Sequence, residues 1–108
     1  MAKTAKRLFG PAVLTNSAAT KYTVPASTKT VIRHIHFNNT DSSARTVTVS
    51  IGADAVGTEL FTGYSIPLNG TYDWYGYIVM DAAEVMQAFA SVTSVVNMTV
   101  FGDEITLG

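Results

Sequence analysis

The sequence predicts an all-β protein: a single β-sandwich, of jelly-roll or immunoglobulin-like type, with about eight short antiparallel strands and an extended N-terminal arm. Threonine and valine, which favour strands, are frequent, and charged residues make up only 14% of the chain. Glycine, proline, asparagine and aspartate recur at short intervals and separate short apolar runs. Several runs alternate apolar and polar residues, as strands with one buried face do. A chain of 108 residues is expected to form one domain.

The predicted arm covers residues 1–11, and the predicted sandwich domain covers residues 12–108. The arm carries basic residues without a following apolar segment, so it is not expected to be a signal peptide. The expected strands lie between the turn signals, at residues 12–15, 21–24, 28–38, 45–51, 59–66, 71–80, 84–91 and 94–102.

The strands differ in how clearly they are marked. In residues 45–51, Val47, Val49 and Ile51 alternate with Thr and Ser, which predicts a half-buried strand. Residues 81–92 contain good helix formers, but they also alternate and are flanked by strands, so a strand is expected there. Asn69-Gly70 is a strong hairpin signal between the strands on either side of it.

Charged residues are segregated along the chain. Residues 1–45 hold all seven basic residues and one acid, while residues 46–108 hold the other seven acids. Two interpretations are open. The opposite charges either pair within the fold, or the basic arm docks on an acidic neighbouring subunit or on nucleic acid.

The chain has no cysteine, which excludes disulfides, thiolate metal sites and cysteine nucleophiles. No run of about 18 apolar residues is present, so no membrane span is expected. The protein is expected to be soluble and to be used without export.

Two histidines lie two residues apart in the run VIRHIHFNN, residues 31–39. On a strand, His34 and His36 would project from the same face, as ligands of one metal ion do. A metal site needs a third ligand, however, and the chain has only two histidines. We therefore expect no metal, and we expect the pair to face solvent or a partner. The opposite face is expected to enter the core with Val31, Ile35 and Phe37.

Catalytic motifs are absent from the sequence. No serine lies in a nucleophile elbow, and no glycine-rich loop is placed to hold phosphate. We therefore expect no catalytic residue, no cofactor and no enzymatic activity. A cupin-like metalloenzyme that uses His34 and His36 is the remaining enzymatic alternative.

Aromatic residues are concentrated in YDWYGY, residues 72–77. Alternation places Tyr72 and Trp74 on one face of a strand and Tyr75 and Tyr77 on the other. Trp74 and its face are expected to enter the core. The other face would then contact a loop, a sugar or a partner subunit.

The segments 21–52, 57–74 and 79–105 together resemble small virion proteins of tailed bacteriophages. The likeness lies in the order of apolar positions and turns, including KYTVPASTKTVIRHIHFNN and SVVNMTVFGDEI. Where these proteins have Gly-Asp before the penultimate strand, this chain has Ala83-Glu84. The resemblance implies a compact β-sandwich that serves as a building block, with no catalytic residues.

The resemblance and the residues together predict a non-enzymatic phage virion structural protein, foremost a capsid decoration or cement subunit. A tail or neck component and a glycan-binding module for host attachment are the alternatives. The expected partners are the major capsid protein or tail subunits and further copies of the chain. Nucleic acid, membranes and small-molecule substrates are not expected as partners. The expected location is the virion, assembled in the host bacterial cytoplasm. The candidate interface residues are Lys3, Lys6, Arg7, His34, His36, Tyr75 and Tyr77.

Overall fold

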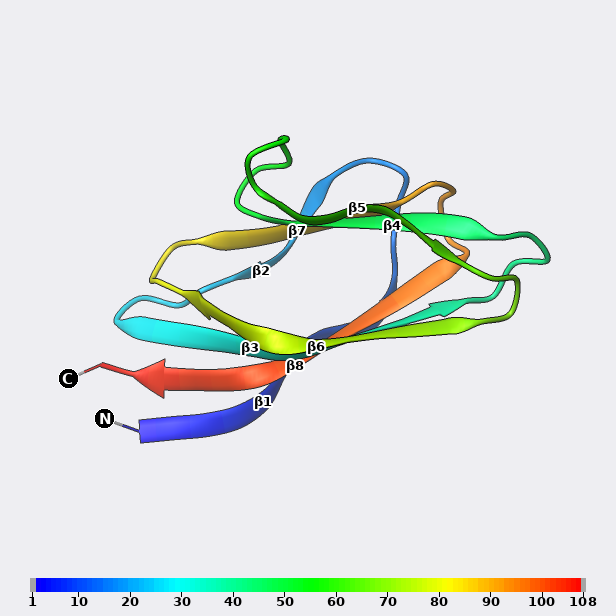
Figure 1. Cartoon of the computed structure of the whole chain (residues 1–108). Coiled ribbons are helices and arrows are strands. Elements are labelled where there is room, and N and C mark those ends of the chain that lie inside the picture. The colour runs from blue at the N-terminus through cyan, green and yellow to red at the C-terminus, as the bar shows by residue number, and fades with distance from the viewer. Residues whose placement is uncertain (1, 108) are drawn as a thin grey trace.

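A computed structural model describes residues 2–107, which form two antiparallel sheets packed face to face (Figure 1). No helix in this range is long and apolar enough to cross a membrane. The strands are β1 (Ala2–Val13), β2 (Ala19–Thr23), β3 (Thr28–Asn39), β4 (Arg45–Ile51), β5 (Glu59–Ile66), β6 (Thr71–Met80), β7 (Val85–Ala90) and β8 (Val96–Thr106).

The strand pairing identifies a jelly roll. The first sheet has the order β1-β8-β3-β6, and the second has the order β2-β7-β4-β5. Strands pair from the two ends of the chain inward, β1 with β8, β2 with β7, β3 with β6 and β4 with β5. The chain is thus one long hairpin, rolled up so that β3 also pairs with β8 and β4 with β7. This confirms the predicted β-sandwich and selects the jelly-roll type.

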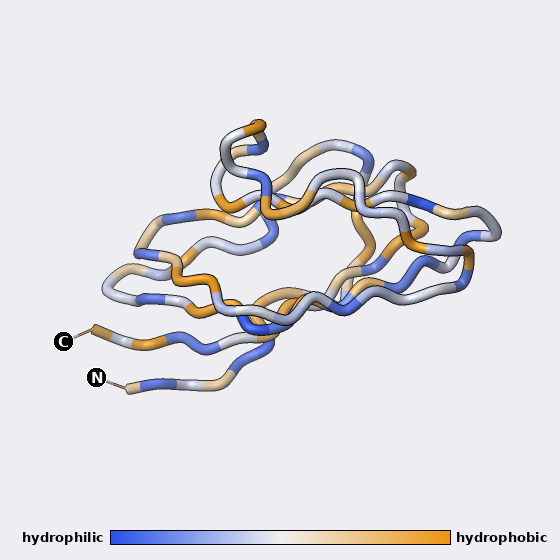
Figure 2. Tube along the Cα trace, viewed as in Figure 1, coloured by the Kyte–Doolittle hydropathy of each residue, from blue (hydrophilic) through white to orange (hydrophobic). Residues whose placement is uncertain are grey.

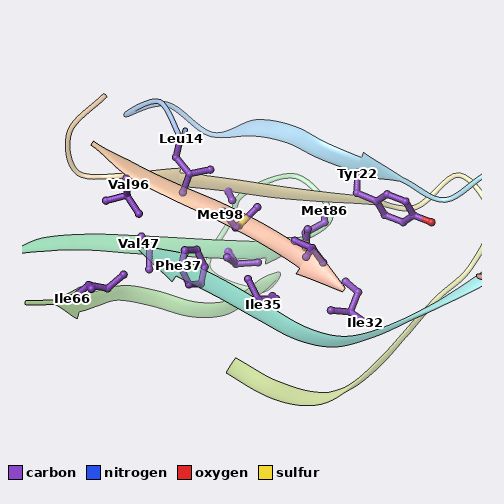
Figure 3. Packing of buried hydrophobic residues seen from close by; sticks show 14 of the residues in the cluster. Leu14, Tyr22, Ile32, Ile35, Phe37, Val47, Ile66, Met86, Val96 and Met98 are labelled. Carbon is purple, nitrogen blue, oxygen red and sulfur yellow. The ribbon is translucent and has the colours of Figure 1, made fainter. Parts of the chain in front are cut away.

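The core lies between the two sheets, where apolar side chains from both layers meet (Figure 3). Figure 2 shows hydrophobic residues interspersed with hydrophilic ones along several strands, as the burial of one strand face requires. Residues 85–90 follow this pattern as strand β7, which confirms the expected strand where propensity allowed a helix. The largest fully buried side chains are Phe37, Leu14, Ile32, Ile35, Ile66, Met80, Met86, Met98, Val24, Val47, Val49 and Val96.

The first strand begins much earlier than the expected 12–15. Residues 2–11, which the sequence indicated as an arm, lie in β1 and pair with β8 along the edge of the first sheet. Residues 2–7 are all exposed, so no apolar alternation marks them as a strand. Backbone pairing holds this segment, and Ala2 lies opposite Thr106, near the other end of the chain.

The expected hairpin at Asn69-Gly70 is wrong. The amide of Gly70 donates to the carbonyl of Pro67 over 2.9 Å, and Asn69 has φ of 51°, so a tight turn does form. The turn nevertheless joins β5 in the second sheet to β6 in the first. The reason lies just before it: the carbonyls of Ile66 and Pro67 accept hydrogen bonds from the buried side chain of Asn39, which directs the chain across the sandwich.

A β-bulge at Arg33 changes which residues of β3 enter the core. Ile32 pairs with Gly102 of β8 and His34 with Phe101, so Arg33 has no partner in the register. The extra residue shifts the alternation between core and outer face by one position. Even-numbered residues face the core before the bulge, and odd-numbered residues face it after the bulge.

The expected core set Val31, Ile35 and Phe37 is therefore partly wrong. Ile32, on the other side of the bulge, joins Ile35 and Phe37 in the central cluster. Val31 is buried but lies outside that cluster. A single-residue bulge leaves no mark in the apolar pattern of this strand, so the sequence did not reveal it.

Tyr22 links the two sheets at one end of the sandwich. Its hydroxyl donates to Glu104 Oε2 over 2.5 Å and lies 2.7 Å from the hydroxyl of Thr30. Burial, followed by the hydrogen bond to Glu104, raises the pKa of Tyr22 to about 12. The phenol is therefore neutral in the folded protein over a pH range in which an unfolded chain already loses its proton, since free tyrosine has a pKa of about 10.

We expect an alkaline loss of stability that depends on Tyr22. Below about pH 10 the buried neutral phenol contributes to the free energy of unfolding. This contribution disappears as the pH rises through about 12, and the free energy of unfolding then falls by on the order of 2 kcal/mol. Urea unfolding at pH 8 to 12 measures it. In Tyr22→Phe the decline between pH 10 and 12 should be smaller than in the wild type, while Tyr75→Phe, an exposed phenol, serves as the control. Identical alkaline profiles of Tyr22→Phe and wild type would contradict the assignment.

Candidate functional site: the outer face of the first sheet

Three rings stack across the centre of the first sheet, on the side that faces away from the core. His34 on β3 lies between Tyr75 on β6 and Phe101 on β8, which are its register partners on either side. The ring centroids of His34 and Tyr75 are 4.3 Å apart with an interplanar angle of 10°. Those of His34 and Phe101 are 5.1 Å apart with an angle of 20°. Stacking on both sides fixes the plane of the imidazole.

Both histidines bind the same carboxylate oxygen. Nε2 of His34 lies 2.8 Å from Oδ1 of Asp73, and Nδ1 of His36 lies 2.6 Å from it. Asp73 is the register partner of His36 on β6, so the pairing of β3 with β6 brings the group together. The hydrogen bonds from His36 and then His34 lower the pKa of Asp73, which is therefore a carboxylate at neutral pH.

The bulge at Arg33 brings a second charged group to the same face. Nε of Arg33 donates to Asp103 Oδ2 over 2.8 Å, and the guanidinium lies 5.3 Å from the ring centroid of Tyr77. Nζ of Lys3 is 3.8 Å from the same carboxylate oxygen. The hydrogen bond from Arg33 is the main cause that lowers the pKa of Asp103.

Large apolar side chains remain exposed around these groups. Tyr75 is 71% exposed and Tyr77 65% exposed, and Val79 and Phe101 are exposed as well. These four side chains alternate with core residues on β6 and β8 and so share the outer face. We call Tyr75, Tyr77, Val79 and Phe101 the aromatic face.

Four of the seven candidate interface residues lie on β3 and β6 at the centre of this region: His34, His36, Tyr75 and Tyr77. Arg7 is exposed on β1 and is the register partner of Phe101. Lys3 pairs with Asp103, and Lys6 forms an ion pair of 2.9 Å with Glu104. Basic residues of the N-terminal part thus pair with acids of the C-terminal part within the chain.

Sequence reasoning missed Asp73, Phe101 and Arg33 as parts of this face. Asp73 and Phe101 meet the histidines only because β3 pairs with β6 and with β8, strands far from it in the sequence. The signal for Asp73 was its alternation with Trp74 on β6, which puts it on the outer face, but nothing local gives the register.

The other half of the aromatic run faces inward, as alternation predicted. Tyr72 and Trp74 pack against the core cluster. A side chain at Gly76 would lie 2.5 Å from the ring of Trp74, so the ring covers this glycine. Tyr75 and Tyr77 are therefore the aromatic residues of this run that a sugar or a partner can reach.

No protein family and no curated protein matches the sequence. Among solved structures, the chain is similar to a protein of Bacillus endospore appendages, which form a family of disulfide-linked pili: the TM-score is 0.55 at 10% identity, over 98% of this chain and 89% of the other. It is also similar to a protein of infectious bursal disease virus, strain Gx, with a TM-score of 0.57 at 7% identity over 99% of this chain. The chain spans 33% of that viral protein. At these identities the likeness concerns the fold alone.

Proposed function

We propose that this protein is a non-enzymatic structural protein of a tailed-phage virion, a decoration or cement subunit on the capsid. It binds other virion proteins through the aromatic face of the first sheet. The exposure of Tyr75 and Tyr77 on a regular sheet carries the proposal. Similar folds in a pilus protein and in a virus protein support a role in assembly.

The aromatic face has the properties of a protein contact surface. Tyrosine and phenylalanine are enriched in interfaces because they bury much apolar area with few rotatable bonds. Here the stacked rings and the contact of Arg33 with Tyr77 hold side chains in place before a partner arrives. Less conformational entropy is then lost on binding.

The edge strand β1 supplies a second contact in this proposal. Residues 2–7 are exposed, and β1 pairs with only one neighbour, so its other edge is open to the backbone of a further chain. Two weak contacts for each subunit are enough for stable attachment to a particle, because many copies bound side by side bind with high avidity.

The proposal is tested by binding to particles. We expect the protein in purified phage particles, and we expect recombinant protein to rebind to particles from which it has been stripped. Tyr75→Ser/Tyr77→Ser should weaken rebinding at least about tenfold, because each buried tyrosine in an interface contributes about 1–2 kcal/mol. Val56→Ser/Leu68→Ser, which removes exposed apolar side chains outside the aromatic face, should rebind like the wild type.

Three results would contradict the proposal. Absence of the protein from purified particles would exclude a virion role. Labelling on the tail or neck would replace the capsid assignment by that alternative. Retention on host cell-wall material that Tyr75→Ser/Tyr77→Ser abolishes, without rebinding to particles, would identify a glycan-binding module.

A further inference from the structure

We propose that His34, His36 and Asp73 form a binding site for one divalent transition-metal ion, Zn²⁺, on the outer face of the first sheet. The sequence lacked a third ligand for the histidine pair, and the pairing of β3 with β6 supplies it. The site goes beyond the proposed structural role and does not depend on it.

The donor set fits zinc. One ligand atom from each of the three side chains lies within 4.8 Å of the other two. Two imidazole nitrogens and one carboxylate oxygen are common ligands of zinc, whereas Mg²⁺ and Ca²⁺ prefer oxygen ligands alone. Three protein ligands leave one position of a tetrahedral ion for water or for a group of another molecule.

The two distances to Asp73 need only small adjustments. Zinc lies about 2.0–2.2 Å from nitrogen and oxygen ligands, so two ligands of a tetrahedral ion are about 3.3 Å apart. The two nitrogens are 2.6 and 2.8 Å from Oδ1 of Asp73. An ion inserted between them would therefore move the nitrogens of His34 and His36 away from Oδ1 by about 0.5 and 0.7 Å. The side chain of Asp73 is 35% exposed, which leaves it free to rotate by this amount.

Neighbouring aromatic rings orient one of the ligands before an ion binds. The rings of Tyr75 and Phe101 hold the imidazole of His34 in the plane that directs Nε2 toward Asp73. Fixed orientation of a ligating histidine strengthens metal binding. Each neutral imidazole would present the nitrogen that faces Asp73 to the ion and would carry its one proton on the other ring nitrogen.

The site is tested by titrating the metal-free full-length chain with Zn²⁺ by isothermal calorimetry and with Co²⁺ by visible absorption. We expect one ion per chain with micromolar affinity, and ligand-field bands of nitrogen- and oxygen-bound Co²⁺. Mg²⁺ should not compete at millimolar concentration. Asp73→Asn and His36→Gln should each weaken Zn²⁺ binding at least about tenfold.

Asp81→Asn is the matched control, because Asp81 is an exposed carboxylate just after β6 that pairs with Lys29 instead of a histidine. It should bind Zn²⁺ like the wild type. Circular dichroism and thermal unfolding without metal verify that each variant is folded, which the partly exposed positions of the ligands favour. Lack of saturable binding by the wild type would overturn the site. So would binding that Asp73→Asn and His36→Gln leave unchanged, because it would show adsorption elsewhere on the surface.

Discussion

Asn39→Asp should destabilise the protein by about 4 kcal/mol, enough to bring a domain of this size close to unfolding. Asn39 is completely buried at the end of β3. Its Nδ2 group donates to the carbonyls of Ser43, Ile66 and Pro67 over 3.0 to 3.1 Å, and its Oδ1 accepts from the amide of Asp41. One side chain thus satisfies backbone groups of two segments of the chain, residues 41–43 and 66–67.

A carboxylate at this position has the size of the amide but no donor. It would place a negative charge against three carbonyl oxygens and remove one hydrogen bond from each, although the carbonyl of Pro67 keeps the bond from the Gly70 amide. A hydrogen bond lost at a buried polar group costs about 1–3 kcal/mol, and the buried charge adds to this. Asn39→Ala removes the same donor without adding a charge, so its cost should be smaller, about 2–3 kcal/mol.

Urea unfolding at pH 7 and pH 4 measures this effect. Asn39→Asp should recover part of its stability at pH 4, since the protonated acid regains one donor and loses its charge. Asn38→Asp introduces the same charge on the adjacent, partly exposed residue of β3 and should change stability by less than about 1 kcal/mol. Equal stabilities of Asn39→Asp and Asn38→Asp would contradict the role given to the Asn39 amide.

Asn39 also explains why the sheet that β6 joins could not be predicted from the sequence. Alternation identified most strands, because each strand of a sandwich buries one face and exposes the other. Asn69-Gly70 correctly marked a turn, but the sheet that a strand joins after a turn depends on tertiary contacts. Here the side chain of Asn39 binds the backbone just before the turn, and β6 pairs with β3 instead of β5.

For the candidate site, too, the sequence predicted which residues share a face of one strand but not which residues of other strands lie beside them. Spacing predicts that His34 and His36 share one face of their strand, and that Tyr75 and Tyr77 share one face of theirs. The proposed metal site also requires Asp73, whose position depends on the register between distant strands. Neighbours across a sheet that are distant in the sequence leave no local pattern, so the sequence did not show that Asp73 lies beside the two histidines.

Phe37→Ala should cost about 3–5 kcal/mol of stability, the range measured for large aromatic side chains in well-packed cores. Phe37 is completely buried between the two sheets (Figure 3). Its ring packs edge-on against Phe61 of the second sheet at 5.9 Å and lies parallel to Tyr72 of the first at 6.1 Å. Removing it leaves a cavity that both sheets border. The paired backbones of β3 and its neighbours resist the collapse that would fill it.

Phe101→Ala is the control that separates the two faces of the first sheet. Phe101 is the same residue type on the adjacent strand β8, but its side chain lies on the outer face and is 37% exposed. Its removal loses part of the ring stack with His34 and should cost about 1 kcal/mol or less. Thermal and urea unfolding of both variants measure the difference. Costs of similar size for Phe37→Ala and Phe101→Ala would contradict the placement of the core between the two sheets. A large difference would show that the ring of Phe101 on the outer face, unlike that of Phe37, is not needed to hold the fold together.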